Sequence, residues 1–104
     1  MGRARQAFLM HLKPGTEVEY QRRHDEIWPE LGELLRVYGI GNYSIFRHGL
    51  DLFAYLEAED LDRLAHLPAE PLMQRWWLAM EDLMDTNPDH SPVQVMLPEV
   101  FHLD

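Results

Sequence analysis

The chain has 104 residues, of which 46% are hydrophobic, and these values are typical of one globular domain covering residues 1–104. The 18 acidic side chains outnumber the nine basic ones, and the net charge of −9 argues against nucleic acid or an anionic membrane as a partner. The absence of cysteine excludes disulfides and cysteine–zinc sites, and no stretch reads as a signal core or a membrane span, so we expect a cytoplasmic protein.

The first predicted element is a strand over residues 6–13. Apolar side chains alternate along it, and Phe8, Met10 and Leu12 should share one face. Pro14-Gly15 should end the strand, because proline and glycine interrupt a regular strand.

A long helix should follow, from Thr16 to about Tyr38. Thr16 and Glu19 match a capping box, in which the two side chains satisfy free backbone N–H groups. Pro29 lies inside the helix and predicts a kink or a break near Ile27-Trp28. An inward-facing stripe at spacings of three and four contains Tyr20, His24, Ile27, Leu31, Leu34 and Tyr38.

The second half of the chain predicts a hairpin, two helices and a last strand. The hairpin strands should be residues 42–47 and 51–57. Asp60 should cap a short helix, and a longer helix should cover residues 71–85. A weak alternation over residues 93–103 predicts the last strand, interrupted at Pro98.

This order, β-α-β-β-α-β, is that of an α+β, ferredoxin-like split βαβ fold, with two helices on one face of a four-stranded antiparallel sheet. The other face also needs cover, because Phe8, Met10 and Tyr43 would form an apolar patch if left exposed. A second subunit packing sheet to sheet, an enclosed ligand, or both could supply this cover.

The first candidate for chemistry is the pair Tyr20 and His24, which are four residues apart and therefore neighbours on one helix face. Histidine exchanges protons near neutral pH, and the tyrosine hydroxyl could orient a substrate hydroxyl. The alternative is a core histidine bonded to a backbone carbonyl, with Tyr20 as packing.

Aromatic side chains supply two further candidates. Trp76 and Trp77 point about 100° apart on a helix, so one could pack in the core while the other faces a cleft. Indole faces stack on the C–H faces of sugars. Tyr43 on its strand could reach a ligand with its hydroxyl. Ordinary core or cross-strand packing is the alternative for all three.

The sequence does not support a metal site. The remaining histidines, His11, His48, His66, His90 and His102, form no H-x-H or H-E-x-x-H pattern. A glycine-rich phosphate loop and a G-x-S-x-G motif are also absent.

Taken together, these clusters resemble the L-rhamnose mutarotase family over nearly the whole chain. One difference is the turn around His48-Gly49, which is shorter than in the family. The matching segments are Tyr20-Gln21-Arg22-Arg23-His24, Ile27-Trp28-Pro29-Glu30-Leu31, Asn42-Tyr43, Gln74-Arg75-Trp76-Trp77, Asn87-Pro88-Asp89, Ser91-Pro92 and Glu99-Val100-Phe101.

The resemblance implies a dimeric α+β barrel and a cytoplasmic isomerase of carbohydrate metabolism that interconverts the α and β anomers of L-rhamnose without a cofactor. By position, His24 matches the proton donor of the family, and Tyr20, Tyr43, Trp76 and Trp77 match its sugar-binding residues. We expect the His24 imidazolium to protonate the ring oxygen. The second acid–base group stays open between Asp89, Tyr20 and water.

Two other functions fit the same fold. Ferredoxin-like dimers include cofactor-free oxygenases and haem-degrading proteins, and the fold alone does not separate these from an isomerase. A sugar-binding or structural dimer without catalysis is the third possibility.

Overall fold

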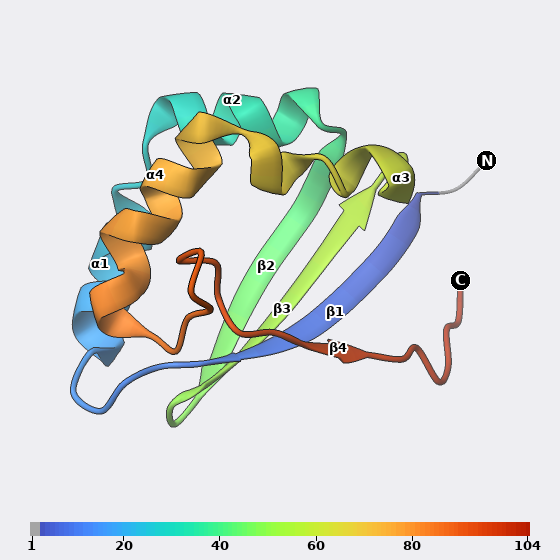
Figure 1. The fold of residues 1–104 in the computed structure, drawn as a ribbon. Coiled ribbons are helices and arrows are strands. Elements are labelled where there is room, and N and C mark those ends of the chain that lie inside the picture. The colour runs from blue at the N-terminus through green and yellow to red at the C-terminus, as the bar shows by residue number, and fades with distance from the viewer. Residues whose placement is uncertain (1–2) are drawn as a thin grey trace.

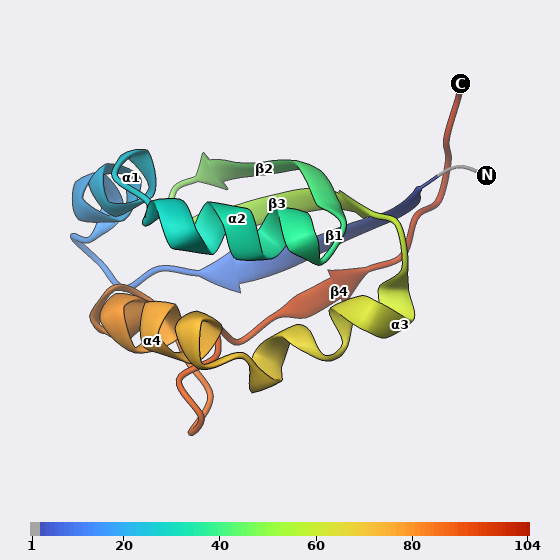
Figure 2. The same ribbon diagram turned by 90° about the horizontal axis from the view of Figure 1, so that it is seen from above.

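Four β-strands form one antiparallel sheet in the computed structural model, which describes residues 3–104. The strand order is β2-β3-β1-β4, so β1 (Ala4–His11) and β3 (Asp51–Ala58) are central, while β2 (Ile40–His48) and β4 (Val95–Leu97) are the edges. The helices cover one face of this sheet (Figures 1 and 2). The predicted α+β fold is confirmed; residues 1 and 2 of the expected domain lie outside the described residues.

The alternation predicted for β1 is confirmed by burial. Phe8, Met10 and Leu12 are 4%, 6% and 0% exposed and face the helices. The strand starts two residues before the predicted position because it pairs with β3 over its whole length, from Ala4 opposite Ala58 to His11 opposite Asp51.

The face of the sheet away from the helices carries other residues than expected. Phe8 and Met10 are buried beneath the helices, and Tyr43 also lies on the helix side, so the expectation that these three form the uncovered patch was wrong. The strand register shows which side chains occupy that face. We call it the open sheet face, and its apolar members are Leu9, Phe46, Phe53, Tyr55, Val95 and Leu97.

The predicted break in the first long helix is confirmed. Helix α1 (Glu17–Asp25) ends before Trp28, whose backbone is extended, and α2 (Pro29–Val37) begins at Pro29. Proline suits the first helical position, because its missing N–H would have no partner there. Gly39 follows α2 with a φ of +78°, a conformation that glycine adopts without strain.

The start of α1 does not use the predicted capping box. The Thr16 hydroxyl donates to the carbonyl oxygens of Lys13 (2.8 Å) and Leu83 (2.9 Å) instead of accepting from a helix N–H. The Glu19 carboxylate is held by Arg22 and Arg23. Tertiary partners therefore outcompete the local motif, although the helix still begins where predicted.

Helix α3 (Leu61–Leu64) and a 3₁₀ turn (Leu67–Ala69) precede the last long helix, and the Asp60 side chain caps α3 by accepting from the N–H of Asp62. Helix α4 (Pro71–Met80) continues only as a 3₁₀ turn (Glu81–Leu83), so the predicted end at residue 85 was too late.

The early end of α4 has a tertiary cause. The N–H of Lys13 donates to the carbonyl of Leu83, and the N–H of Asp85 donates to the carbonyl of His11. These bonds draw the chain after α4 into an extended pairing beyond the end of β1, which a continued helix would prevent.

The last strand is also shorter than predicted. Only Val95–Leu97 pair with β1, and Pro98 ends the ladder because it has no N–H to donate. Residues 98–104 form no further strand, and Arg5 of β1 holds this segment by bonding the Glu99 carboxylate (2.7 Å) before the chain runs on to its end (Figure 1). None of the helices formed by residues 3–104 is long and apolar enough to cross a membrane.

Candidate active site

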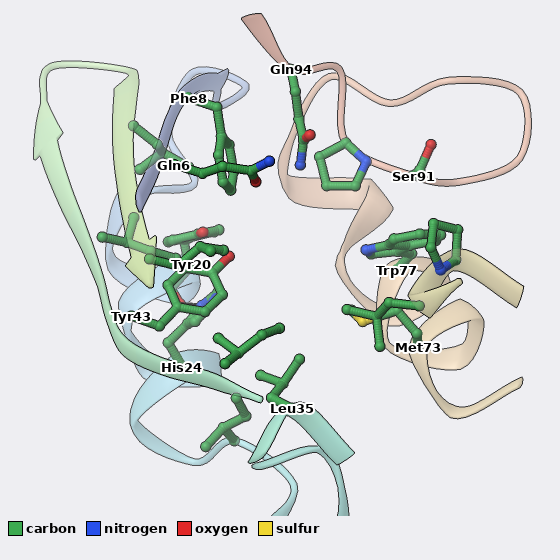
Figure 3. Close-up of a pocket in the computed structure, with 18 of the residues that line it drawn as sticks. Gln6, Phe8, Tyr20, His24, Leu35, Tyr43, Met73, Trp77, Ser91 and Gln94 are labelled. Atoms are coloured by element: carbon green, nitrogen blue, oxygen red, sulfur yellow. Dashed lines mark hydrogen bonds between the residues drawn. The ribbon is translucent and has the colours of Figure 1, made fainter. Parts of the chain in front are cut away.

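An open cavity of about 1130 Å³ lies between the helices and the inner face of the sheet (Figure 3). This volume is large for a small-molecule site, which typically occupies roughly 300–1,000 Å³. Four of the five predicted site residues line it: Tyr20, His24, Tyr43 and Trp77.

Helix α1 presents Tyr20 and His24 to the cavity from consecutive turns. Their ring centroids are 4.4 Å apart, as expected for an i, i+4 pair. Tyr20 is 7% exposed and anchors this helix face in the core, so that His24 is held beside it.

The His24 ring is oriented by the backbone. Its Nδ1 lies 3.2 Å from the carbonyl oxygen of Tyr20. A carbonyl oxygen only accepts, so Nδ1 carries the proton of this bond and Nε2 is left for the cavity. Burial lowers the pKa of His24 below its ordinary 6.5, while the bond to Tyr20 and the charge of Asp25 act against that shift.

The hydroxyl groups of Tyr20 and Tyr43 stay protonated because their pKa values are raised. Burial raises the pKa of Tyr43 to about 12, and burial together with the neighbouring Tyr43 raises the pKa of Tyr20 above its usual 10. Tyr43 as a residue is 39% exposed, but its hydroxyl points into the cavity (Figure 3). Both groups can therefore donate hydrogen bonds to a ligand at any physiological pH.

A β-bulge turns Tyr43 toward the cavity. Gly41 pairs with Glu57 and Ser44 pairs with Tyr55, so two residues of β2, Asn42 and Tyr43, lie opposite one residue of β3. Asn42 takes the positive φ of 47° that this requires. Without the extra residue, alternation from the buried Ile40 would place Tyr43 on the open sheet face.

The structure divides the two adjacent tryptophans between different environments. Trp77 lines the cavity, with its indole N–H toward the interior (Figure 3). Trp76 does not line the cavity; it is 8% exposed and packs edge-on against His24, with ring centroids 5.5 Å apart. The rings of Trp28 and Trp76 also form a T-shaped pair, with centroids 5.1 Å apart.

Arg23 fixes α1 to the end of α4. Its guanidinium donates to the carbonyl oxygen of Ala79 (2.6 Å) and to both carboxylate oxygens of Asp82 (2.9 and 3.2 Å). It also donates to Glu19 (2.7 Å) on its own helix. Because His24 is the next residue, the bonds from Arg23 to Ala79 and Asp82 also hold the imidazole at a set distance from Trp76.

Asp89, one of the candidates for a second acid–base group, lies in the loop that borders the cavity. Its carboxylate accepts from the N–H (3.0 Å) and the hydroxyl of Ser91. These bonds lower the pKa of Asp89, so that it is ionised at neutral pH and has no proton to give. Among residues 3–104, no three His, Asp or Glu side chains stand together as a metal site would require.

Gln6 and Gln94 are among the polar residues of the cavity that sequence reasoning missed. Figure 3 shows both amides at one end of the cavity and Leu35 at the other end. For Gln6 a signal existed, because it occupies an inward position of β1 between apolar neighbours. Gln94 follows a loop, and its local sequence carries no such signal.

The L-rhamnose mutarotase family model matches residues 5–103 of the chain. The chain belongs to this family. An L-rhamnose mutarotase of Opitutus terrae is 51% identical over 102 residues, which cover 96% of this chain and 98% of the relative. The L-rhamnose mutarotase of Leptothrix cholodnii is 52% identical over 103 residues, with 94% of each chain covered.

A solved structure supports the same assignment. The crystal structure of an L-rhamnose mutarotase from Formosa agariphila superposes with a TM-score of 0.89 at 38% identity, covering 97% of this chain and 99% of that one. The resemblance stated from the sequence motifs is therefore confirmed, and this L-rhamnose mutarotase family member spans nearly the full length of its relatives.

Proposed function

We propose that this chain is a cytoplasmic L-rhamnose mutarotase, a cofactor-independent isomerase that interconverts the α and β anomers with His24 as the residue that moves the proton. The observation that most directly supports this proposal is the placement of the His24 imidazole. Its Nδ1 bonds to the Tyr20 carbonyl, and its Nε2 is free beside a cavity lined by hydroxyl groups. Family membership supports the substrate.

The position of His24 suits both proton transfers of ring opening, removal from the anomeric hydroxyl and delivery to the ring oxygen. With its pKa lowered, the imidazole is neutral at pH 7 and its Nε2 can take the proton of the anomeric hydroxyl. The bond between C1 and the ring oxygen then breaks, and the imidazolium returns the same proton to that oxygen. The imidazolium expected from the sequence is thus an intermediate state, formed from a neutral resting imidazole.

Ring closure on the other face of the aldehyde needs rotation about the C1–C2 bond, while the rest of the sugar stays bound. Tyr20 and Tyr43 would donate to sugar hydroxyls, and Trp77 would cover an apolar face of the sugar. For Trp76, its buried contact with His24 favours a role in positioning the imidazole over the sugar contact predicted from the sequence.

The test is two-dimensional NMR exchange between the two anomeric signals of L-rhamnose at a catalytic protein concentration. General acid–base groups typically contribute about 10²–10⁴-fold, so His24→Gln should lower kcat by that order while the sugar still binds. His66→Ala, at an exposed histidine outside the cavity, is the matched control. A His24→Gln variant as fast as the parent would show that another group moves the proton.

A homodimer that packs through the open sheet face is part of the same proposal. Phe46 and Phe53 are 66% and 41% exposed and lie opposite one another on neighbouring strands. Contiguous apolar surface of this kind typically marks an interface. Phe53→Glu should convert a dimer into a monomer in analytical ultracentrifugation, and a parent chain that sediments as a monomer would refute this part.

A further inference from the structure

Gln6 is a polar residue in an apolar row. It lies on β1 between Ala4 and Phe8, on the face that packs against the helices, and it pairs with the buried Leu56 of β3. The pairing with β3 holds its backbone, and the ladder between β1 and β4 begins at the next residue, Ala7. Its amide is therefore presented to the cavity from a rigid element.

Gln94 reaches the same end of the cavity from a separate segment. On one side of it, the N–H of Val93 donates to the carbonyl of Asp85 (3.1 Å); on the other side, Val95 pairs with Leu9. These anchors hold its backbone in place, and Figure 3 shows its amide turned toward that of Gln6.

Both amides have unused hydrogen-bonding capacity. Within residues 3–104 neither side chain bonds to another residue, whereas the amide of Gln74, outside the cavity, donates to the carbonyl oxygen of Pro68 (2.9 Å). An amide offers one acceptor and two donors, and a sugar hydroxyl is both a donor and an acceptor. A pair of free amides therefore matches adjacent hydroxyls on a pyranose ring.

We infer that Gln6 and Gln94 form a hydroxyl-recognition subsite that determines which sugars the enzyme accepts, an inference that rests on the proposed function. Leu35 lies at the opposite end of the cavity, and its aliphatic side chain suits the methyl group of a 6-deoxy sugar. The amide end and the aliphatic end together orient the ring, while His24 approaches the anomeric carbon from the side. The two glutamines are thus specificity residues, separate from the proton transfer.

The experiment compares the parent with Gln6→Met and Gln94→Met, which keep side-chain length and remove the amide. Kinetics of anomer exchange are measured on L-rhamnose and on analogues that each lack one ring hydroxyl. We expect each variant to raise KM for L-rhamnose about 3- to 10-fold with little change in kcat. Each variant should also no longer distinguish L-rhamnose from the analogue that lacks the hydroxyl bound by the deleted amide.

Gln74→Met is the control, because it deletes an amide outside the cavity, and thermal melting checks that all three variants fold. Unchanged discrimination against every analogue, or an equal loss on all sugars, would overturn the inference. Tryptophan fluorescence titrations with the same sugars repeat the comparison without turnover. A parent that binds L-rhamnose but does not exchange its anomers would refute the proposed reaction and still test the two amides.

Discussion

Replacing Trp76 with phenylalanine separates a packing role from a sugar-binding role for this residue. Trp76 is 8% exposed, contacts His24 and Trp28 in T-shaped arrangements and does not line the cavity. Trp77, the next residue, lines the cavity and is only partly buried. Trp77→Phe is therefore the matched control for the same chemical change on the same helix.

The expected cost of Trp76→Phe follows from the volume it leaves empty. Phenylalanine is smaller by about three heavy atoms, and each buried methylene equivalent is worth about 0.8 kcal/mol. Partial collapse of the core around the smaller ring reduces the loss, so we expect about 2 kcal/mol of destabilisation. For a domain of this size that lowers Tm by roughly 8–16 °C.

The effect on catalysis should appear in kcat. Without the full indole beside it, the His24 ring has room to shift, and small displacements of a catalytic group slow the reaction steeply. We expect kcat for anomer exchange to fall roughly 10-fold with KM little changed. Trp77→Phe should do the reverse, with a raised KM and a smaller fall in Tm.

Thermal melting by circular dichroism and NMR exchange at several L-rhamnose concentrations measure these quantities. The reasoning fails if Trp76→Phe leaves Tm within about 2 °C of the parent. It fails equally if Trp76→Phe raises KM as much as Trp77→Phe does, since that result would mean that Trp76 touches the sugar.

Three further predictions concern His24, Gly39 and Arg23. Because burial lowers the pKa of His24, kcat/KM should be flat near neutral pH and fall as acid protonates the imidazole, and the fall should vanish in His24→Gln. Because the pKa of His24 is lower in the folded chain than in the unfolded chain, acid protonates the unfolded chain first and stabilises it. Tm should therefore also fall as the pH drops below 6.5. Gly39→Ala should destabilise by about 1–2 kcal/mol in urea unfolding, since φ is +78° and the added Cβ would lie 3.2 Å from the Glu59 Cβ; an unchanged midpoint would contradict this. Arg23→Lys should lower both Tm and kcat, because a compact ammonium lacks the planar fork by which the guanidinium bonds both Asp82 oxygens and the Ala79 carbonyl at once. Arg36→Lys on the exposed face of α2 should change neither.

The sequence by itself determined the order of the local elements and some of their ends. Alternation of Phe8, Met10 and Leu12 identified the inner face of β1, because side chains on a strand point alternately to opposite sides. Pro29 marked the break between α1 and α2, and the i, i+4 spacing placed Tyr20 and His24 together. These outcomes depend on backbone geometry that is the same in any fold.

Only the tertiary structure decided which neighbouring side chain faces the cavity. Trp76 and Trp77 are adjacent and chemically identical, so the sequence does not tell them apart. The packing of α4 against α1 and α2 directs Trp76 to the core and Trp77 to the cavity. The bulge at Asn42 and the presence of Gln6 and Gln94 at one end of the cavity likewise depend on strand pairing between distant segments. Local patterns limit which faces a residue can occupy, but the free energy of long-range packing selects the face, and no single segment contains that information.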